Sequence, residues 1–223
     1  MDRRLFFQAM GKFAAGLIIV ALMLFVPAGT LDYPNGWLFI VVLFAPMFAA
    51  GIVMMLKNPE LLRKRLDAKE SEPEQKRVVA ASGLMFAAVF IIAGLNFRFR
   101  WLTLPRWAVW TAAAVFLLAY LMYAEVLREN TYLSRTVEVQ EGQKVIDTGL
   151  YGVVRHPMYS ATIFLFLSMP LILGSPVSFF IMLAYLPLIG RRMKNEEKVL
   201  ENGLEGYSDY KKRVRYRVIP FIW

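Results

Sequence analysis

Long uncharged stretches divide the chain into segments that could cross a membrane. The first four lack Asp, Glu, Lys and Arg throughout: Phe13–Leu31, Tyr33–Leu56, Val78–Phe97 and Trp107–Ala124. A fifth uncharged run, Pro157–Gly190, is longer still. A helix needs about 20 predominantly apolar residues to cross a hydrocarbon core of roughly 30 Å. The pattern therefore predicts an all-α, polytopic membrane protein.

Turn-forming residues interrupt the fifth run. Pro170 and a later Gly-Ser-Pro sequence divide it, because proline ends helices and Gly-x-Pro favours a reversal of the chain. We expect a helical hairpin with arms at about Met158–Leu173 and Val177–Gly190, the second continuing as a helix beyond Arg191. The chain then has six membrane helices if both arms cross, and four spans with a shallow hairpin otherwise.

The distribution of basic residues predicts the orientation in the membrane. The segments before the first run, after the second, after the fourth and after the hairpin carry three, seven, four and nine Lys or Arg. The loop between the third and fourth runs carries three, and the turn between the first and second carries none. Excess positive charge marks the cytoplasmic face. Both termini are therefore expected in the cytoplasm, and a prokaryotic plasma membrane is the default location.

The amino-acid composition excludes several classes of protein and several kinds of site. Of 223 residues, 58% are hydrophobic and 19% are charged, with a mean hydropathy of +0.47, which excludes an ordinary soluble or disordered chain. The absence of cysteine excludes disulfides and thiolate sites, and a single histidine excludes a His-cluster metal site. The net charge of +9 lies in loops beside spans, which favours lipid headgroups over nucleic acid as its partner.

Candidate chemistry gathers in the last hundred residues. The only histidine, His156, lies between an arginine and Pro157 where the hairpin begins, and a helix N-terminus offers unpaired N–H groups to a carboxylate. Arg192 and Glu196 follow the hairpin and share a helix face. Taken singly, these features are equally compatible with interfacial side chains and an ordinary ion pair at the end of a span.

Taken in order, the motifs are more specific. They run Gly-x-Tyr-x-x-x-Arg-His-Pro-x-Tyr, a membrane hairpin, Arg-x-x-x-Glu-Glu-x-x-Leu, Gly-Tyr-x-x-Tyr and a terminal Arg-x-x-Pro. This series, over about Asn130–Trp223, closely resembles the isoprenylcysteine carboxyl methyltransferase family, which belongs with the membrane phospholipid methyltransferases. The earlier spans match that family only in character.

The resemblance implies S-adenosylmethionine-dependent methylation at the cytoplasmic membrane face. It implies that Arg192 and Glu196 are catalytic, with Arg192 beside the acceptor group, and that His156 and the helix N-terminus suit the methionyl carboxylate of the cofactor. The residues that it places around the cofactor are Gln140, Gln143, Lys144, Val145, Ile146, Tyr151, His156, Pro157, Met158, Tyr159 and Glu196. It also implies two parts, a four-span scaffold at residues 1–126 and a cytosol-facing catalytic part at 127–223 with its hairpin at 158–190.

The acceptor is expected to be a carboxylate on a prenylcysteine-like or other lipophilic molecule. Transfer of a methyl group from a sulfonium to a carboxylate removes opposite charges, so a dry site favours it and no base is needed. An amine acceptor, as in a phospholipid, would need deprotonation first. A phospholipid or small-lipid N-methyltransferase remains the alternative, as does a non-catalytic lipid-binding membrane protein. Neither metal nor nucleic acid is an expected partner.

Overall fold

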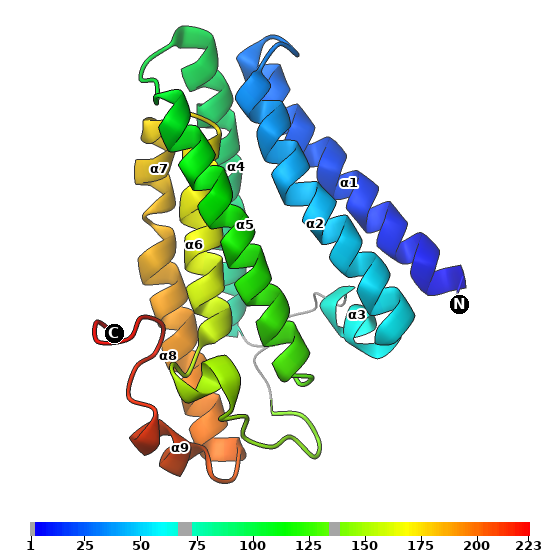
Figure 1. The fold of residues 1–223 in the computed structure, drawn as a ribbon, viewed down its shortest axis with the longest axis vertical. Helices are drawn as coiled ribbons and strands as arrows, with labels where there is room; N and C mark the ends of the chain where they lie inside the picture. Colours follow the sequence, from blue (N-terminus) through cyan, green and yellow to red (C-terminus); the bar gives the residue numbers. More distant parts are fainter. Residues whose placement is uncertain (1–2, 67–72, 134–138) are drawn as a thin grey trace.

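The computed structural model describes residues 3–66, 73–133 and 139–223, and every regular element in these ranges is helical (Figure 1). The N-terminal helices are α1 (Arg3–Ala28), α2 (Pro34–Lys57), α3 (Pro59–Leu66), α4 (Pro73–Phe99) and α5 (Arg106–Glu129). A 3₁₀ turn, η1 (Gly149–Gly152), precedes α6 (Pro157–Ile172), α7 (Pro176–Met182), α8 (Tyr185–Gly203) and α9 (Tyr207–Arg213). The predicted all-α class is confirmed for this part of the chain.

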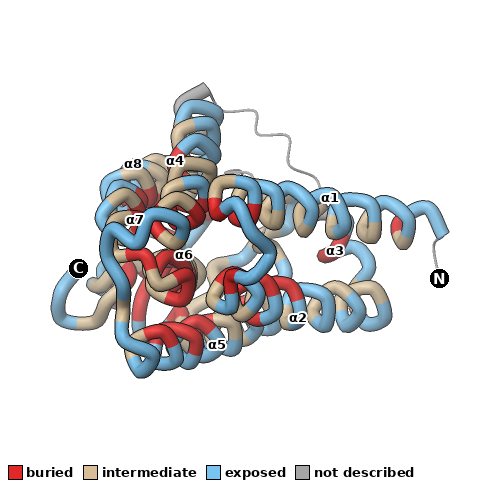
Figure 2. The backbone as a smooth tube through the Cα atoms, turned by 90° about the horizontal axis from the view of Figure 1, so that it is seen from above, coloured by how far each residue is buried: buried red, intermediate tan, exposed pale blue. Residues whose placement is uncertain are grey.

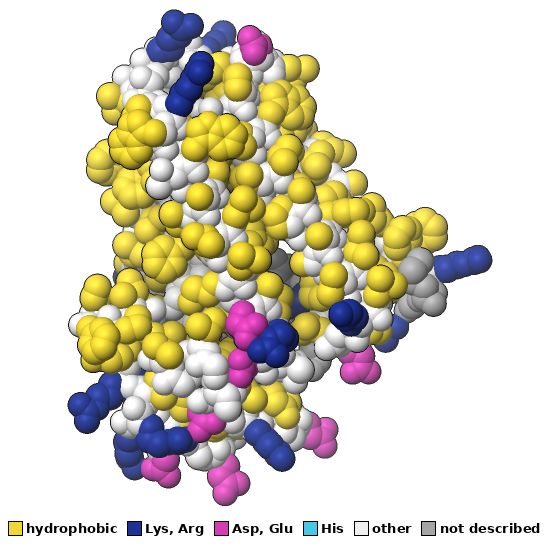
Figure 3. Space-filling model, in the orientation of Figure 1, with side chains coloured by type: hydrophobic (Ala, Val, Ile, Leu, Met, Phe, Trp, Pro, Cys, Tyr) yellow, Lys and Arg dark blue, Asp and Glu magenta, His cyan; other side chains and the backbone are white. Residues whose placement is uncertain are grey.

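Four of the described helices are long and apolar enough to cross a membrane: α1, α2, α5 and the Lys76–Phe99 part of α4. Apolar side chains cover the outer surface along the bundle, and charged side chains gather toward its two ends (Figure 3). Phe7, Leu22 and Leu118 are each more than half exposed, which suits contact with lipid rather than water. Because α6 has only 16 residues, six crossings stay a prediction.

Proline sets where several of these helices begin. Pro34, Pro157 and Pro176 occupy the first turn of α2, α6 and α7, where a missing N–H costs no hydrogen bond. Pro170, in contrast, was expected to divide the fifth apolar run, yet α6 continues through it for two more residues. The chain reverses instead at Gly174, whose φ of +73° suits glycine.

The second arm of the hairpin is broken, whereas the sequence predicted one helix over Val177–Gly190. α7 ends three residues before α8 begins. Pro187 explains the break, because it lacks the N–H that would bond to the Leu183 carbonyl one turn earlier. The Leu186 N–H donates to that carbonyl instead, at 3.1 Å. The predicted continuation of the arm beyond Arg191 is confirmed, since α8 extends well past it.

The buried side chains lie where α6 packs against α5 and where α4 packs against α1 and α7 (Figure 2). A Cβ on Gly94 of α4 would lie 2.5 Å from the Leu24 carbonyl of α1, so glycine permits this close approach. The Tyr33 hydroxyl donates to the Leu173 carbonyl at 2.6 Å and ties the start of α2 to the hairpin turn. The hairpin is thereby held inside the bundle.

Residues 139–156 and 204–223 form a cap around the end of the bundle where α8 emerges (Figure 1). The cap has a small apolar core of its own, made of Leu204, Tyr207, Tyr210 and Val214. The N–H groups of Arg155 and His156 donate to the carbonyls of Tyr216 and Arg217 at 2.9 and 2.8 Å. These bonds hold the C-terminal tail beside the first turn of α6. The division of the chain at residues 126 and 127 stays a prediction.

Candidate cofactor site

A cavity lies between the cap and the first turn of α6, with α8 forming another wall. We call it the C-terminal cavity. Its empty space is about 850 Å³, counting the part that is open to solvent. The predicted site residues that line it are Gln143, Lys144, Val145, Ile146, Tyr151, His156, Met158, Tyr159, Arg192 and Glu196. The structure thus brings these separate motifs together.

Two predicted residues do not line the cavity. The Gln140 side chain donates to the Tyr132 carbonyl, and its backbone N–H donates to the Gln143 side-chain oxygen at 2.9 Å. Gln140 therefore shapes the loop that forms one wall. Pro157 is the first residue of α6 and sets the direction of that helix. Gln140 and Pro157 therefore affect the shape of the cavity only through the residues next to them.

A hydrogen-bonded row crosses one wall of the cavity from α6 to α8. The Tyr159 hydroxyl donates to Glu196 Oε2 at 2.5 Å, and Arg192 Nε donates to the same hydroxyl at 3.1 Å. Arg192 and Glu196 are one helical turn apart on α8, so they lie on the same face. Tyr159 therefore fixes the positions of both predicted catalytic side chains.

His156 lies beside two glutamates. It is the residue just before α6, and its ring is only 4% exposed. Its Nε2 atom lies 3.3 Å from Glu197 Oε1, and its Nδ1 atom lies 3.9 Å from Glu196 Oε1. Both ring nitrogens therefore face carboxylates of the protein. The predicted contact between His156 and a cofactor carboxylate stays a prediction, and it would depend on the helix N-terminus as well as on the ring.

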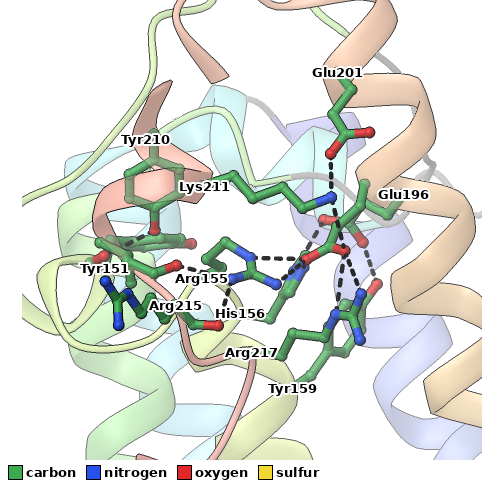
Figure 4. Close-up of polar contacts among 12 residues, drawn as sticks. Tyr151, Arg155, His156, Tyr159, Glu196, Glu201, Tyr210, Lys211, Arg215 and Arg217 are labelled. Atoms are coloured by element: carbon green, nitrogen blue, oxygen red, sulfur yellow. Dashed lines mark hydrogen bonds and ion pairs between the residues drawn. The ribbon is translucent and has the colours of Figure 1, made fainter. Parts of the chain in front are cut away.

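Glu197 is the centre of a buried ion network that the sequence analysis did not assign. Figure 4 shows its partners Arg155, His156 and Arg217 gathered around it. Its carboxylate accepts from Arg155 Nε at 2.8 Å and from Arg217 Nη2 at 2.9 Å, and it is 3% exposed. Burial by itself raises the pKa of Glu197, but the hydrogen bonds from His156, Arg217 and Arg155 outweigh burial and hold that pKa well below its ordinary value. Glu197 is therefore ionised and joins α6, α8 and the tail.

Arg155 completes that connection. One of its guanidinium nitrogens donates to the carbonyls of Val214 and Arg215 at 2.8 and 2.7 Å. With Glu197, these bonds satisfy a guanidinium that is almost fully buried. In the motif Arg-His-Pro, Arg155 thus holds the tail, and both Arg155 and His156 line the cavity.

Aromatic residues make the opposite wall. Asn130 donates to the Tyr151 hydroxyl at 2.9 Å, and the Tyr210 hydroxyl donates to the Tyr151 carbonyl at 2.8 Å. Burial raises the pKa of Tyr151 to about 12 and also raises that of Tyr210, so both phenols are neutral near pH 7. This wall therefore offers neutral ring faces and no charge.

Tyr207 differs from the other buried polar side chains that the structure describes. Within the described ranges, its hydroxyl is the only buried side-chain nitrogen or oxygen without a hydrogen-bond partner. Tyr207 lines the cavity and is 4% exposed. A buried hydroxyl without a partner is unfavourable by about 1–3 kcal/mol, so a polar ligand group in the cavity would relieve it. Gly206, at a φ of +81°, directs the chain into α9 and sets this tyrosine in place.

The sequence contained signals for some of the residues that the prediction missed. Tyr207 and Tyr210 form the Gly-Tyr-x-x-Tyr motif, and Glu197 is the second acid of the Glu-Glu pair. Asn130 and Tyr132 also line the cavity, yet they follow α5 with no motif around them. Among the side chains that the structure describes, no group of acids and histidine is suited to a metal ion.

Comparison with known proteins links this region of the chain to a family. The sequence model of the isoprenylcysteine carboxyl methyltransferase family matches residues 110–202. Over this region the chain is similar to that family. The resemblance predicted from the motifs is confirmed, and the match includes the predicted site residues on α6 and α8.

A solved structure shows that the likeness in fold extends beyond that region. It is described as the eukaryotic intramembrane Ras methyltransferase ICMT, an isoprenylcysteine carboxyl methyltransferase, without a monobody. The match has a TM-score of 0.59 at 20% identity and covers 94% of this chain and 75% of that one. At this identity the likeness establishes the fold alone.

Curated relatives of this chain carry a different activity in their names. A Delta(14)-sterol reductase of Mus musculus is 30% identical over 91 residues, which is 40% of this chain and 22% of the relative. The Delta(14)-sterol reductase of Methylotuvimicrobium alcaliphilum is 23% identical over 135 residues, or 54% of this chain and 32% of the relative. That of Arabidopsis thaliana is 26% identical over 133 residues, or 55% of this chain and 36% of the relative. This chain therefore spans about a third or less of their lengths.

Proposed function

We propose that the protein is an S-adenosylmethionine-dependent membrane methyltransferase that methylates the carboxylate of a prenylcysteine-like or other lipophilic acceptor. The observation that carries the proposal is the C-terminal cavity, in which Tyr159, Arg192 and Glu196 form one hydrogen-bonded row beside Tyr207. The family match over residues 110–202 supports it.

The lining of the cavity fits this cofactor. S-adenosylmethionine supplies, when bound, a methyl group on a positively charged sulfur. Glu196 is partly exposed and suits ribose hydroxyls or an amino group, while Tyr151 and Tyr159 provide aromatic surface for the adenosine or the cation. The Tyr207 hydroxyl lacks a partner that a polar ligand would provide. The backbone of residues 143–146 lies on the same wall and offers further hydrogen-bonding groups.

Few catalytic groups are needed for this reaction. The acceptor carboxylate is ionised near neutral pH, so the protein does not have to remove a proton. Its main contribution is to align two bound molecules, for which well-oriented systems gain roughly 7–11 kcal/mol. Arg192 suits a carboxylate by its planar fork, and its Nε atom donates to the Tyr159 hydroxyl, which fixes the position of the guanidinium group.

The test is methyl transfer from radiolabelled S-adenosylmethionine to a farnesylcysteine analogue by the purified protein in lipid. We expect a base-labile methyl ester, because a carboxylate is the acceptor. A lipid with new N-methyl groups, resolved by mass, would replace this acceptor with an amine. Binding of the cofactor with neither product would reject both acceptor classes.

The curated relatives favour a second candidate, reduction of a sterol-like double bond. The C-terminal cavity would then hold a hydride donor such as a reduced nicotinamide cofactor. Titration of the same preparation with NADPH and with S-adenosylhomocysteine separates the two candidates. Binding of NADPH alone, together with loss of a sterol double bond, would establish the reductase and reject the methyltransferase.

A further inference from the structure

A second hollow lies on the other side of Arg192, between the start of α4 and the middle of α8. Its empty space is about 820 Å³, counting the part open to solvent, and its charged lining is entirely basic: Arg77, Arg191, Arg192, Lys194 and Lys198. We call it the basic hollow. Arg191, Lys194 and Lys198 are three and four residues apart on α8, so they form one stripe along the helix.

Within the described part of the chain, Arg77, Arg191, Lys194 and Lys198 make no ion pair with an acid. Exposed basic residues elsewhere do: Arg128 pairs with Glu125, and Arg213 pairs with Asp147. Like charges at this helical spacing are unfavourable, so an external anion would relieve them.

The position of the hollow indicates the source of that anion. Arg77 is the second residue of the membrane-crossing part of α4. Arg191 is the first charged residue after the uncharged run that ends at Gly190. Basic residues on two adjacent helices therefore meet at the level where the apolar surface ends, which is where lipid headgroups lie.

We propose that the basic hollow binds the phosphate-bearing headgroup of an anionic bilayer lipid, next to the C-terminal cavity. Arg192 lines both spaces, so the bound headgroup would lie directly behind the wall that carries the Tyr159–Glu196 row. The acyl chains would extend along the apolar surface of α4. This site does not depend on the proposed methyl transfer, because lipid binding is measured without turnover.

The experiment is native mass spectrometry of the purified full-length protein with phosphatidylglycerol, phosphatidylcholine or inorganic phosphate. Arg77, Lys194 and Lys198 are exposed, so the triple variant Arg77→Gln, Lys194→Gln, Lys198→Gln removes charge without opening the core. We expect phosphatidylglycerol to bind the wild type more tightly than phosphatidylcholine, and the variant to lose about tenfold or more of that affinity.

A matched control removes three exposed lysines at the same end of the bundle that do not line the hollow: Lys57→Gln, Lys76→Gln, Lys212→Gln. It should keep phosphatidylglycerol binding within about twofold of the wild type. Equal losses in both variants would overturn the proposal, because attraction would then come from overall charge. No preference for phosphatidylglycerol would also overturn it, as would inorganic phosphate that displaces the lipid at equal concentration.

Discussion

Tyr207 is the single residue whose surroundings most directly indicate a ligand. Its hydroxyl is buried without a partner, while the neighbouring Tyr210 hydroxyl donates to the Tyr151 carbonyl. The two tyrosines come from the same short helix and motif, yet only one of them is satisfied by the protein. The difference is the basis of a matched pair of variants.

We expect Tyr207→Phe to leave the free protein as stable as the wild type, or more stable, because no hydrogen bond is lost. Its affinity for S-adenosylhomocysteine should fall about two- to tenfold, the value of one hydrogen bond. Tyr210→Phe should instead lower the melting temperature, because it removes a buried hydrogen bond. Calorimetry and thermal unfolding measure both effects, and an unchanged affinity in Tyr207→Phe would contradict the placement of the ligand.

Arg192 and Glu196 should separate in their effects on binding and on turnover. Arg192→Ala should lower kcat by tenfold or more with a smaller effect on cofactor affinity, because we propose that Arg192 binds the acceptor. Glu196→Ala should chiefly weaken cofactor binding, as should His156→Ala. Arg192→Lys should not restore turnover, because lysine lacks the planar fork. Normal cofactor affinity in all three alanine variants would contradict the assignment of the site.

Glu197 should make stability depend on acid pH. Because the pKa of Glu197 is depressed in the folded protein, its contribution is present above its ordinary value of 4.5 and is lost as pH falls below it. The melting temperature of the wild type should therefore fall below about pH 4.5. Glu197→Gln should lose about 3–5 kcal/mol of stability near neutral pH, because Arg155 and Arg217 lose their buried partner. Its acid dependence should be weaker than that of the wild type.

The sequence predicted most of the residues around the cavity, and the exceptions have physical reasons. The motif residues His156, Arg192 and Glu196 could be found because their order along the chain is specific. The residues of the ion network around Glu197 also belong to the motifs, but their pairing could not be predicted, because Arg217 approaches Glu197 only after the tail folds back. Such long-range pairing leaves no local pattern.

At the scale of elements, the break between α7 and α8 is the main departure from the prediction. The run of uncharged residues predicted the position of the second arm correctly. It gave no information about the backbone hydrogen bond that is missing at Pro187. Pro187 could have indicated the break from the sequence alone, because proline cannot donate a hydrogen bond to the carbonyl one turn earlier. Pro170 shows why that signal was ambiguous, because α6 continues through it.

The break sets the direction of α8 and hence the position of Arg192 and Glu196. Pro187→Ala would restore an N–H that can donate to the Leu183 carbonyl, which favours one straight helix. Alanine is preferred to proline inside a helix by about 3 kcal/mol. Pro187 is exposed, so no cavity forms. We expect slower hydrogen exchange around Leu183 together with lower methyl transfer, because Arg192 and Glu196 shift. The exposed control Leu186→Ala should change neither, and full activity in Pro187→Ala would show that the break does not orient the site.

At the scale of the whole molecule, two surfaces of different chemistry meet at one end of the bundle. Exposed apolar side chains cover the four long helices, and the cap holds a polar cavity at their end (Figure 3). A lipophilic acceptor would reach this end from the bilayer, while a water-soluble cofactor would enter from the aqueous side. The arrangement is suited to joining molecules that do not share a solvent.

The central claim is that the C-terminal cavity binds the methyl donor, and calorimetric titration tests it most directly. The purified wild type should bind S-adenosylhomocysteine at a 1:1 ratio and should not bind NADPH. Glu196→Ala and Tyr207→Phe should both bind it more weakly. Binding of NADPH without S-adenosylhomocysteine, or wild-type affinity in both variants, would contradict the account.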